Sequence, residues 1–362
     1  MSTVLPTPGV LRQDAPETGL LGLAERGLLP DAAIRFGIRR LCAQRLQECM
    51  GGGAAMQQAR HQRLVEALRR MPLAVHTEAA NAQHYEVPAT FFQRCLGPRL
   101  KYSACLFERP GATLAEAEEA MLGLYGVRAG LEDGMDILEL GCGWGSLTLW
   151  MAQRYPGARI TAVSNSHSQR AWIEERCREQ GLANVRVLTC DVNVLDLPAG
   201  SFDRCVSVEM FEHVRNHEAL MARIAGWLRP RGRLFVHIFA HRLAAYPFDT
   251  GGEGNWMGRH FFTGGLMPAA DTLLHLQGDL VLERRWLVDG VHYQRTAEAW
   301  LDNQDRQRER LLPVLAQAYG GDAQGRLWFQ RWRMFWMSCA ELFGYEGGQQ
   351  WLVAHYLFAP RR

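Results

Sequence analysis

Between residues 136 and 237, short apolar runs alternate with segments whose apolar residues recur every three or four positions. The first pattern is typical of buried strands and the second of amphipathic helices. Strands alternating with helices form a parallel sheet with right-handed crossovers, so we expect an α/β fold. The predicted strands are 136–140, 159–164, 185–189, 202–208 and 233–237, with a turn at Pro230–Gly232, and the predicted helices are 147–154, 168–181 and 217–228.

The chain before this region has a different pattern. Residues 1–30 contain prolines and little periodicity, which predicts a loose tail. Helical periodicity begins near Asp31, is broken at Gly51–Gly53, and returns over 56–70. We therefore divide the chain into an N-terminal tail and helical accessory region, residues 1–75, and a main domain, residues 76–362. In the main domain, 81–107 carries two clusters rich in His, Tyr, Ser and Cys that can close over a ligand, and 113–129 is a predicted helix.

Beyond residue 240 the alternation is lost. Residues 247–267 are rich in glycine and aromatic side chains, which predicts a loop at the active site. Insertions between about 241 and 345 are expected to cover the substrate. In this part of the chain we predict strands over 279–286, near His292-Tyr293 and over 350–358, and two amphipathic helices over 297–318 and 326–343.

Composition places the chain among ordinary soluble globular proteins. Of its 362 residues, 48% are hydrophobic and 22% are charged, and the formal net charge is +2. This balance gives no sign of the basic face that nucleic-acid binding requires. No apolar run approaches the roughly 20 residues of a membrane span, and no signal-peptide pattern opens the chain. We expect a cytoplasmic protein with no transmembrane segment and no nucleic-acid partner.

Cysteine and histidine spacing gives no support for a disulfide framework or a metal site. The nine cysteines are scattered, and none forms a C-x-x-C pair, so we expect reduced thiols. Two histidine pairs have the i, i+4 spacing of zinc ligands on a helix, His213 with His217 and His237 with His241. The glutamate of H-E-x-x-H is absent from both pairs, and we therefore expect no bound metal.

The strongest local signal is residues 136–145, where an apolar strand runs into a glycine turn and then a helix. Gly141, Gly143 and Gly145 suit a backbone that takes positive φ or approaches a ligand closely. A strand, a glycine turn and a helix N-terminus form a cradle for a nucleotide cofactor. The spacing is G-x-G-x-G, not the G-x-G-x-x-G of dinucleotide sites, and Glu139 lies two residues before it.

This acidic-then-glycine pattern resembles motif I of the class I S-adenosylmethionine (SAM) methyltransferases. SAM has no pyrophosphate, but it has an α-ammonium with which the carboxylate of Glu139 can pair. The resemblance implies a Rossmann-like, doubly wound sheet, here with an N-terminal helical cap and a C-terminal helical insertion. The alternative is an ordinary glycine-rich turn between a strand and a helix.

Polar residues at the other strand ends are further candidates, because ligands of open α/β sheets bind there. Asp191 follows the third strand, where a carboxylate can accept a hydrogen bond from the adenine amine; the alternative is a helix-capping role. The second strand ends at Asn165 instead of the acid that commonly holds the ribose hydroxyls. An amide can also bond a ribose, and Gln169 can assist it.

Glu209, Glu212 and His213 form the strongest catalytic cluster, directly after the fourth strand. At helical spacing these three residues share a face. Two carboxylates and an imidazole at a cofactor site can shift one another's pKa and take up a proton near neutral pH. The alternative is a polar helix start with solvated acids.

Together the motifs resemble the cyclopropane-fatty-acyl-phospholipid synthase family of SAM-dependent enzymes, and within it the plant coclaurine N-methyltransferase branch. The resemblance extends from about residue 80 to the end of the chain. It rests on Lys101-Tyr-Ser-Ala-Cys105, Leu138-Glu-Leu-Gly-Cys-Gly-Trp-Gly-Ser-Leu-Thr-Leu149, Ser164-Asn-Ser166, Val208-Glu-Met-Phe-Glu-His-Val214, His292-Tyr293 and Ala340-Glu-Leu-Phe-Gly-Tyr345. Two of these signatures, Ser146-Leu-Thr-Leu149 and Ala340-Glu-Leu-Phe-Gly-Tyr345, fit the amine-methylating branch better than the lipid branch.

The resemblance implies a set of site residues. Those expected to contact SAM are Tyr102, Ser103, Gly141, Gly143, Asn165, Gln169 and Asp191, beside Glu139. Glu209, Glu212 and His213 are expected to position and deprotonate a substrate amine. The substrate pocket is expected to include His237, Tyr293, Trp332 and Phe335, since an aromatic wall can hold a cationic amine.

We therefore predict a SAM-dependent methyltransferase that acts on a small-molecule amine. The alternative enzyme methylates or cyclopropanates unsaturated acyl chains. In such lipid enzymes a bound bicarbonate serves as the base, held by residues that match Glu212, His237 and Tyr293 and by a cysteine whose position is Ala104 here. An inactive SAM-binding protein is the non-enzyme alternative, and the intact acidic cluster argues against it. A homodimer is one assembly open to this chain.

Overall fold

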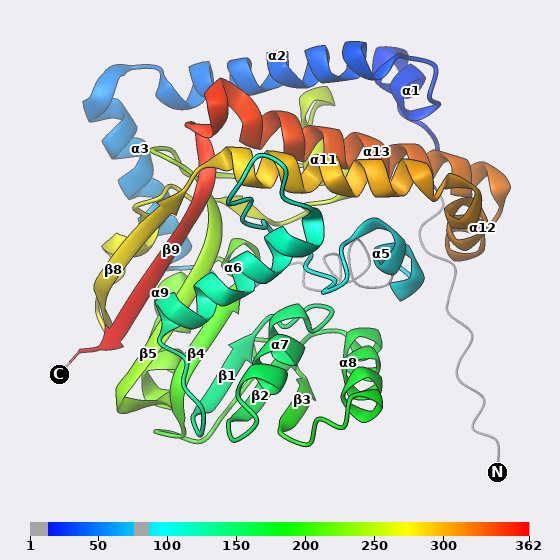
Figure 1. Ribbon diagram of the computed structural model, residues 1–362. Helices are drawn as coiled ribbons and strands as arrows, with labels where there is room; N and C mark the ends of the chain where they lie inside the picture. The colour runs from blue at the N-terminus through cyan, green and yellow to red at the C-terminus, as the bar shows by residue number, and fades with distance from the viewer. Residues whose placement is uncertain (1–13, 76–86, 362) are drawn as a thin grey trace.

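The computed structural model describes residues 14–75 and 87–361. Residues 1–13 of the predicted tail and residues 81–86 of the predicted ligand-closing segment therefore lie outside the described residues. Figure 1 shows a mixed sheet at the bottom of the molecule with long helices laid across its upper edge. The N-terminal helix α2 (Asp31–Met50) and the C-terminal helix α13 (Asp322–Gly344) lie side by side there, although they are distant in sequence.

Seven strands form the main sheet in the order β3-β2-β1-β4-β5-β9-β8. The five strands from β3 to β5 are parallel, and β9 is antiparallel to both of its neighbours. This is the doubly wound sheet that the alternating pattern predicts. The strands are β1 (Asp136–Leu140), β2 (Arg159–Ser164), β3 (Val185–Thr189), β4 (Phe202–Val208), β5 (Leu228–His241), β8 (Leu280–Val288) and β9 (Trp351–Pro360), and β6 (Tyr246–Pro247) pairs with β7 (Leu266–Met267).

Helices cover both faces of this sheet because alternate residues of each strand point in opposite directions. Ile137 and Val206 pack with α6 (Leu114–Ala129) and α7 (Ser146–Arg154). Leu138 and Leu140 pack on the opposite face with α9 (His217–Trp227). Thr113 caps α6 by accepting from the Glu116 backbone amide, in a capping box. The other helices of the described chain are α1 (Gly19–Glu25), α3 (Gly53–Leu68), α5 (Ala89–Cys95), α8 (His167–Glu179), α10 (Trp256–His260), α11 (Gly290–Arg306) and α12 (Arg308–Tyr319).

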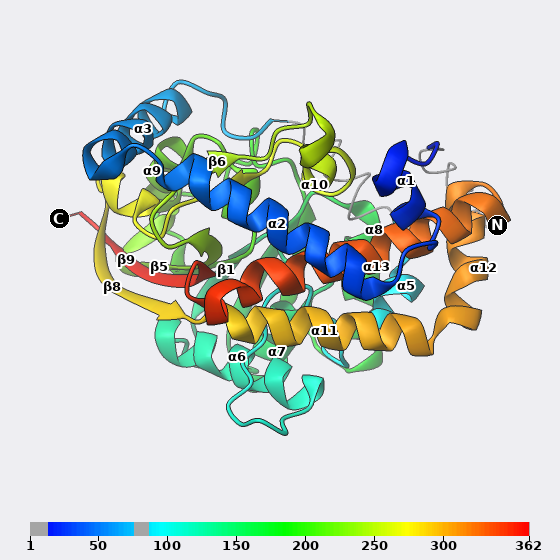
Figure 2. The ribbon, with the colours of Figure 1, turned by 90° about the horizontal axis from the view of Figure 1, so that it is seen from above.

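The helices above the sheet hold an aromatic core over the carboxyl ends of the strands. In Figure 2, seen from above, α2, α11 and α13 run beside one another across the molecule. Trp300 from α11 and Trp336 from α13 are fully buried and meet edge to face, with ring centroids 5.1 Å apart. Burying these large rings is the physical reason that the C-terminal helices close over the sheet.

Three predictions for secondary structure are wrong. His292 and Tyr293 lie in α11, where Tyr293, Ala297 and Trp300 recur at helical spacing and face the core. Pro230–Gly232 lies inside β5, at an irregularity in its pairing with β4. The C-terminal pair of predicted helices is a set of three, α11, α12 and α13.

The end of the predicted loose tail is also ordered. Residues 19–25 form α1, and Glu25 is fully buried beside Arg331 of α13, with Oε1 and Nε 3.0 Å apart. Trp256 of α10 donates to the same carboxylate at 2.7 Å. This buried ion pair fixes α1 to both the aromatic helix layer and the loop region 247–267, which forms η3 (Glu253–Asn255), α10 and β7 instead of remaining irregular.

Candidate active site

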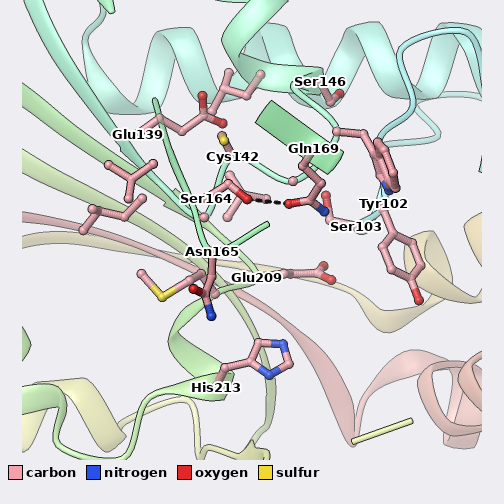
Figure 3. Close-up of a pocket in the computed structure, with 18 of the residues that line it drawn as sticks. Tyr102, Ser103, Glu139, Cys142, Ser146, Ser164, Asn165, Gln169, Glu209 and His213 are labelled. Atoms are coloured by element: carbon pink, nitrogen blue, oxygen red, sulfur yellow. Dashed lines mark hydrogen bonds between the residues drawn. The ribbon is translucent and has the colours of Figure 1, made fainter. Parts of the chain in front are cut away.

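A pocket opens at the carboxyl ends of β1, β2 and β4, where an open α/β sheet places its ligands. Figure 3 shows Glu139 and Cys142 on one side of it, and Glu209 with His213 on another. Each residue predicted to contact the cofactor lines this pocket: Tyr102, Ser103, Glu139, Gly141, Gly143, Asn165, Gln169 and Asp191. The structure thus brings together eight residues that are spread over about 90 positions of the sequence.

Positive backbone angles explain the glycine turn. Gly141, Gly143 and Gly145 have φ of 79°, 52° and 82°, a region that other residues rarely adopt. A Cβ on Gly141 would lie 2.6 Å from the Cβ of Met210, so this turn also packs too closely for a side chain. A Cβ on Gly143 would meet nothing within 4 Å, which leaves bare backbone at the pocket wall.

Two buried polar atoms beside the glycine turn fit a nucleoside ligand. The Gln169 Oε1 accepts from the Ser164 hydroxyl at 2.6 Å, which turns the amide and leaves Nε2 without a hydrogen-bond partner among the described residues. The Ser146 hydroxyl is also buried and unpartnered within the described chain. Both residues line the pocket, and unsatisfied buried groups are costly unless a ligand completes them. The donor set therefore fits the sugar and amino-acid groups of SAM.

Asp191 and Glu139 have different environments within the same pocket. Asp191 Oδ1 accepts from the Asn193 backbone amide at 2.7 Å within a turn, and no helix follows it before β4 in the described chain, so the helix-capping alternative is wrong. Glu139 is buried and accepts from the Thr148 hydroxyl. Burial raises the pKa of Glu139 to about 8, with the Thr148 hydrogen bond acting in the opposite direction.

Glu209 is the most tightly held carboxylate of the site. One oxygen accepts from the Ala104 backbone amide at 2.9 Å and lies 3.0 Å from His237 Nε2, and the other accepts from the Tyr293 hydroxyl at 2.7 Å. Its φ of 46° is unusual for a glutamate and marks local strain at the end of β4. Burial raises its pKa, whereas Lys101 and the donors from Ala104 and Tyr293 lower it.

The other two residues of the predicted acidic cluster lie on different sides of η2 (Phe211–His213). His213 lines the pocket and stacks on Phe262, with ring centroids 5.0 Å apart. Burial lowers the pKa of His213 to about 4, so its imidazole is neutral at physiological pH. Glu212 does not line the pocket; it is fully buried and accepts from the Phe239 backbone amide at 2.8 Å. Burial, followed by the nearby Glu209, raises the pKa of Glu212 well above its usual range.

A chain of buried hydrogen bonds ends at Glu209, and its direction is fixed by chemistry. Arg128 Nη1 lies 2.7 Å from His355 Nδ1, and a guanidinium can only donate, so His355 Nδ1 accepts. Neutral His355 then carries its proton on Nε2, which lies 2.8 Å from His237 Nδ1. Neutral His237 in turn carries its proton on Nε2 and donates to Glu209. We call Arg128, His355 and His237 the donor chain.

Burial supports this assignment of protons in the donor chain. His237 and His355 are both fully buried, and burial lowers the pKa of each well below 6.5, with Arg128 acting in the same direction. Both imidazoles are therefore neutral and have one donor and one acceptor each. The Tyr125 hydroxyl also lies 2.9 Å from His237 Nδ1.

Sequence reasoning missed several residues that shape this site. Lys101 is almost fully buried, donates to the Ala104 carbonyl at 2.6 Å, and lies in a motif already quoted for other residues. Its ionic influence on Glu209 had no sequence signal, and the same is true of Arg128 and His355. Two residues predicted in the substrate pocket do not line it. Trp332 packs beside Phe335 in the aromatic core, and His237 is fully buried and contacts the pocket only through Glu209.

Aromatic side chains form the remaining wall of the pocket, next to His213. The lining rings come from the segment after α5, from β5, from the loop before β7, from α11 and from α13: Tyr102, Phe239, Phe262, Trp300 and Phe335. Aromatic faces bind flat apolar groups and also attract cations. The pocket therefore combines a buried carboxyl group, a neutral imidazole and an aromatic wall.

Comparison with known proteins places the chain in one family. The family model for mycolic acid cyclopropane synthetase matches residues 74–349. The chain belongs to this family. An (S)-coclaurine N-methyltransferase from Thalictrum flavum subsp. glaucum is 39% identical over 345 residues, which are 94% of this chain and 95% of that protein.

Further similar proteins come from both the amine-methylating branch and the lipid branch of this family. A crystal structure of coclaurine N-methyltransferase bound to N-methylheliamine and SAH has a TM-score of 0.91 at 37% identity, covering 94% of this chain and 98% of that one. The cyclopropane-fatty-acyl-phospholipid synthase of Escherichia coli (strain K12) is 29% identical over 277 residues, 75% of this chain and 66% of that protein. The predicted family, the Rossmann-like fold and a SAM-dependent methyltransferase are confirmed.

Proposed function

We propose that this methyltransferase transfers a methyl group to the nitrogen of a small amine that carries an aromatic ring. The observation that carries the proposal is the buried Glu209 carboxylate, which three donors hold at the pocket wall beside a neutral His213. A fixed anion attracts an ammonium substrate, and a neutral imidazole can take up its proton. The relatives named for coclaurine N-methylation support the same substrate class.

The same carboxylate argues against the acyl-chain alternative. In the lipid branch the resemblance implies a bicarbonate held in part by residues matching His237 and Tyr293. In this chain both side chains instead hydrogen-bond Glu209, and the Ala104 amide completes the set. We infer that the protein's own carboxylate takes the place of that anion. An uncharged double bond gains nothing from it, whereas a cationic amine does.

The role of each residue in the proposed reaction follows from this geometry. SAM supplies an electrophilic methyl group on its sulfonium sulfur. Because Glu209 already accepts three hydrogen bonds, it acts as a fixed counter-charge that orients the amine. His213 is the residue that we assign as proton acceptor, directly or through water. Aromatic groups of the substrate then pack against Phe262 and Phe335, which orients the nitrogen lone pair for transfer.

The cofactor assignments within the pocket are proposals of the same kind. We assign Gln169 and Asn165 to the ribose, Asp191 to the adenine amine, and Glu139 to the amino-acid end of SAM. Tyr102 and Ser103 complete the wall opposite the glycine turn. Gln169 has the clearest test, because its unpartnered amide predicts that Gln169→Ala raises the Kd for SAM by about tenfold.

Radiolabelled methyl transfer distinguishes the proposed substrates. We expect label from SAM to enter 1,2,3,4-tetrahydroisoquinoline far faster than piperidine, which has the same type of nitrogen and no aromatic ring. Vesicles of phospholipid with monounsaturated chains are expected to remain unlabelled. Label in the lipid with none in either amine would overturn the proposal in favour of the acyl-chain alternative.

Two substitutions test the assigned roles on the best amine of such a panel. Glu209→Gln keeps the shape but loses the charge, and we expect kcat/KM to fall about 100-fold. His213→Ala removes the proton acceptor, and we expect kcat to fall by a similar factor, with a smaller loss at high pH where the free amine is more abundant. If the wild type and His213→Ala had equal activity at neutral pH as well as at high pH, His213 would be excluded as the base.

The cellular setting is proposed on separate evidence. All nine cysteines are free, which suits a reducing compartment, and we propose the cytoplasm. In the described part of the chain, we find no helix with the length and apolar character needed to cross a bilayer. A homodimer is proposed as the assembly to test by light scattering.

A further inference from the structure

A second cluster of chemically active side chains lies away from the pocket, where the N-terminal helices meet the sheet domain. Helix α3 lies next to the β8 edge of the sheet (Figure 1) and is adjacent to the turn η4 (Thr272–His275). Arg69, just after α3, donates to the His275 carbonyl at 3.1 Å. His61 from α3 faces Asp271 and His275 in this interface.

The three side chains converge at distances that suit a metal ion. His61 Nδ1 and Asp271 Oδ1 are 3.5 Å apart, and His275 Nε2 and Asp271 Oδ2 are 3.9 Å apart. All three ligand atoms lie within 4.8 Å of one another. Ligand bonds of about 2.0–2.1 Å at a tetrahedral ion place donor atoms about 3.4 Å apart. The first distance already meets this value, and His275, whose side chain is 36% exposed, can rotate to close the second.

Two details of the cluster point toward a bound cation. The Asp271 Oδ1 atom is buried and has no hydrogen-bond partner among the described residues, which is unfavourable for a carboxylate oxygen. His61 is 6% exposed, and its Nε2 lies 3.2 Å from the Thr272 hydroxyl. In the tautomer with the proton on Nε2, the Thr272 hydroxyl can accept that proton in a hydrogen bond, and the Nδ1 lone pair is then directed at Asp271, as in histidines that bind metals.

The surrounding charges permit a cation at this place. The adjacent Arg69 is paired with Glu218, with Nε and Oε2 3.2 Å apart. None of the three ligands lines the catalytic pocket, so the cluster is not part of the site described above.

We propose that His61, Asp271 and His275 bind one Zn²⁺ ion, with water completing the coordination. Two imidazoles and one carboxylate match the borderline character of Zn²⁺, whereas Ca²⁺ and Mg²⁺ prefer oxygen ligands throughout. The ion would join α3 of the accessory region to η4 of the sheet domain, and its role is structural. Sequence spacing gives no hint of this site, because His61 lies far from the other two residues in the chain.

Metal binding is measured on the full chain after removal of any histidine tag and of bound metal by a chelator. Isothermal titration with ZnCl₂ is expected to give one equivalent per chain for the wild type. Asp271→Asn and His275→Ala change exposed positions and are expected to weaken binding at least tenfold without unfolding the protein. His167→Ala removes an exposed histidine elsewhere and is expected to bind as the wild type does.

Thermal unfolding gives an independent readout. A ligand that binds only the folded state raises Tm, and Zn²⁺ at about 100 times its Kd is expected to raise Tm by several degrees in the wild type and in His167→Ala. The two cluster variants are expected to show no such shift. The proposal is overturned if the wild type takes up no stoichiometric Zn²⁺, or if Asp271→Asn and His275→Ala bind it as tightly as the wild type.

Discussion

Glu209 combines a strained backbone conformation with a carboxylate that three donors hold in place. Its φ of 46° suits glycine better than glutamate, and its carboxylate is held by Ala104, His237 and Tyr293. A strained conformation persists where the surroundings determine it, and such residues gather at functional sites. We therefore attribute the glutamate at this position to the function of its carboxylate, because the backbone conformation alone favours glycine.

The Glu209→Gly variant separates the effect of the carboxylate charge from the effect of the strained backbone. We expect Glu209→Gly to reduce methyl transfer about 100-fold or more, because the three donors lose their acceptor. The backbone strain is relieved in this variant, and the vacated space is bordered by the same donors. Added formate is therefore expected to restore part of the activity, measured as initial rates at increasing formate concentration.

The matched control is Glu209→Gln, whose carboxamide still fills the space and should not respond to formate. If formate affects both variants equally, or neither, then the three donors do not form an anion site and the role given to Glu209 is wrong. Measurement of SAM binding in each variant ensures that the comparison concerns the amine side of the pocket.

The residues of the site were predictable to different degrees. Gly141, Asn165 and Asp191 follow predicted strands, and strand ends meet at one edge of a parallel sheet, so sequence order alone brings them together. His355 and Arg128 had no such signal. His355 lies in the middle of β9 and Arg128 in the last turn of α6, and the contact of each with the site depends on packing between segments that are far apart in the chain.

At the scale of elements, β9 and α6 connect the pocket to the β8 edge of the sheet through the donor chain. His355 lies opposite His237 in the antiparallel pairing of β9 with β5. Arg128, near the end of α6, lies over the Trp286 ring at 5.0 Å and is only partly buried. A charge near the surface thus fixes the tautomers of two buried imidazoles and, through them, the orientation of Glu209.

Removing the charge at the outer end of the donor chain should change catalysis without any contact to substrate. We expect Arg128→Met to lower kcat about threefold to tenfold, with little change in the KM for SAM. Loss of an ordered donor also raises the pKa of Glu209, so the acid limb of the kcat–pH profile is expected to move to higher pH.

Arg128→Lys keeps a cationic donor and is expected to restore most of the wild-type profile. Arg231→Met removes an exposed arginine elsewhere and should leave the profile unchanged. An Arg128→Met enzyme with a wild-type pH profile would show that the tautomers of His237 and His355 are set without Arg128.

The ion pair between α1 and α13 makes a prediction about stability. Arg331 and Glu25 are both fully buried, and removing one partner of such a pair leaves an uncompensated charge. We expect Arg331→Met to lower the free energy of unfolding by about 3 kcal/mol. The exposed Arg39, paired with Glu341 at 2.8 Å, provides the control, and Arg39→Met should cost less than about 1 kcal/mol.

Urea unfolding followed by tryptophan fluorescence measures both losses. Similar losses for Arg331→Met and Arg39→Met would contradict the idea that burial makes the first pair important. In that case α1 would be attached mainly by its apolar contacts.

Element boundaries were predictable where a local pattern decides them. The four strands from β1 to β4 were predicted with the bounds that the structure has, because each is an apolar run between clear turn residues. The segment at His292-Tyr293 was not, because two residues cannot distinguish strand from helix spacing. Gly290 also begins that helix under tight packing, where a Cβ would lie 2.1 Å from the Trp351 carbonyl oxygen, and no sequence pattern reveals such a contact.

At the scale of the whole molecule, buried titratable groups set the dependence of stability on pH. In the described part of the chain, burial lowers the pKa of eight histidines, among them His213, His217 and His241 to about 4. The others are His61, His237, His260, His292 and His355. The unfolded chain binds protons at these positions from about pH 6.5 downward while the folded chain does not, so stability is lost as the pH falls from 6.5 toward 4.

Buried carboxyl groups act with the opposite sign. Burial raises the pKa of Glu139 to about 8, so the folded state keeps a proton that the unfolded state loses above about pH 4.5. Its contribution to stability is present at low pH and is lost as the pH rises toward 8. Because the histidines outnumber such carboxyl groups, we expect maximal stability near pH 6.5.

Urea midpoints between pH 4.5 and 8.5 test this prediction. We expect a steep fall on the acid side and a shallower fall on the alkaline side. Glu139→Gln should flatten the alkaline side and leave the acid side as it is. A midpoint that is constant from pH 7 to pH 4.5 would mean that the buried histidines become protonated in the folded state.

The position of β9 between β5 and β8 has a consequence for synthesis of the protein on the ribosome. β8 pairs only with β9 in the main sheet, so it has no partner strand until residues 351–360 have emerged. The same residues bring His355 beside His237. A nascent chain can thus form its glycine turn early, but the hydrogen bonds that align the Glu209 carboxylate require the last strand. A chain truncated before residue 351 would keep the residues of the proposed cofactor pocket and lack His355.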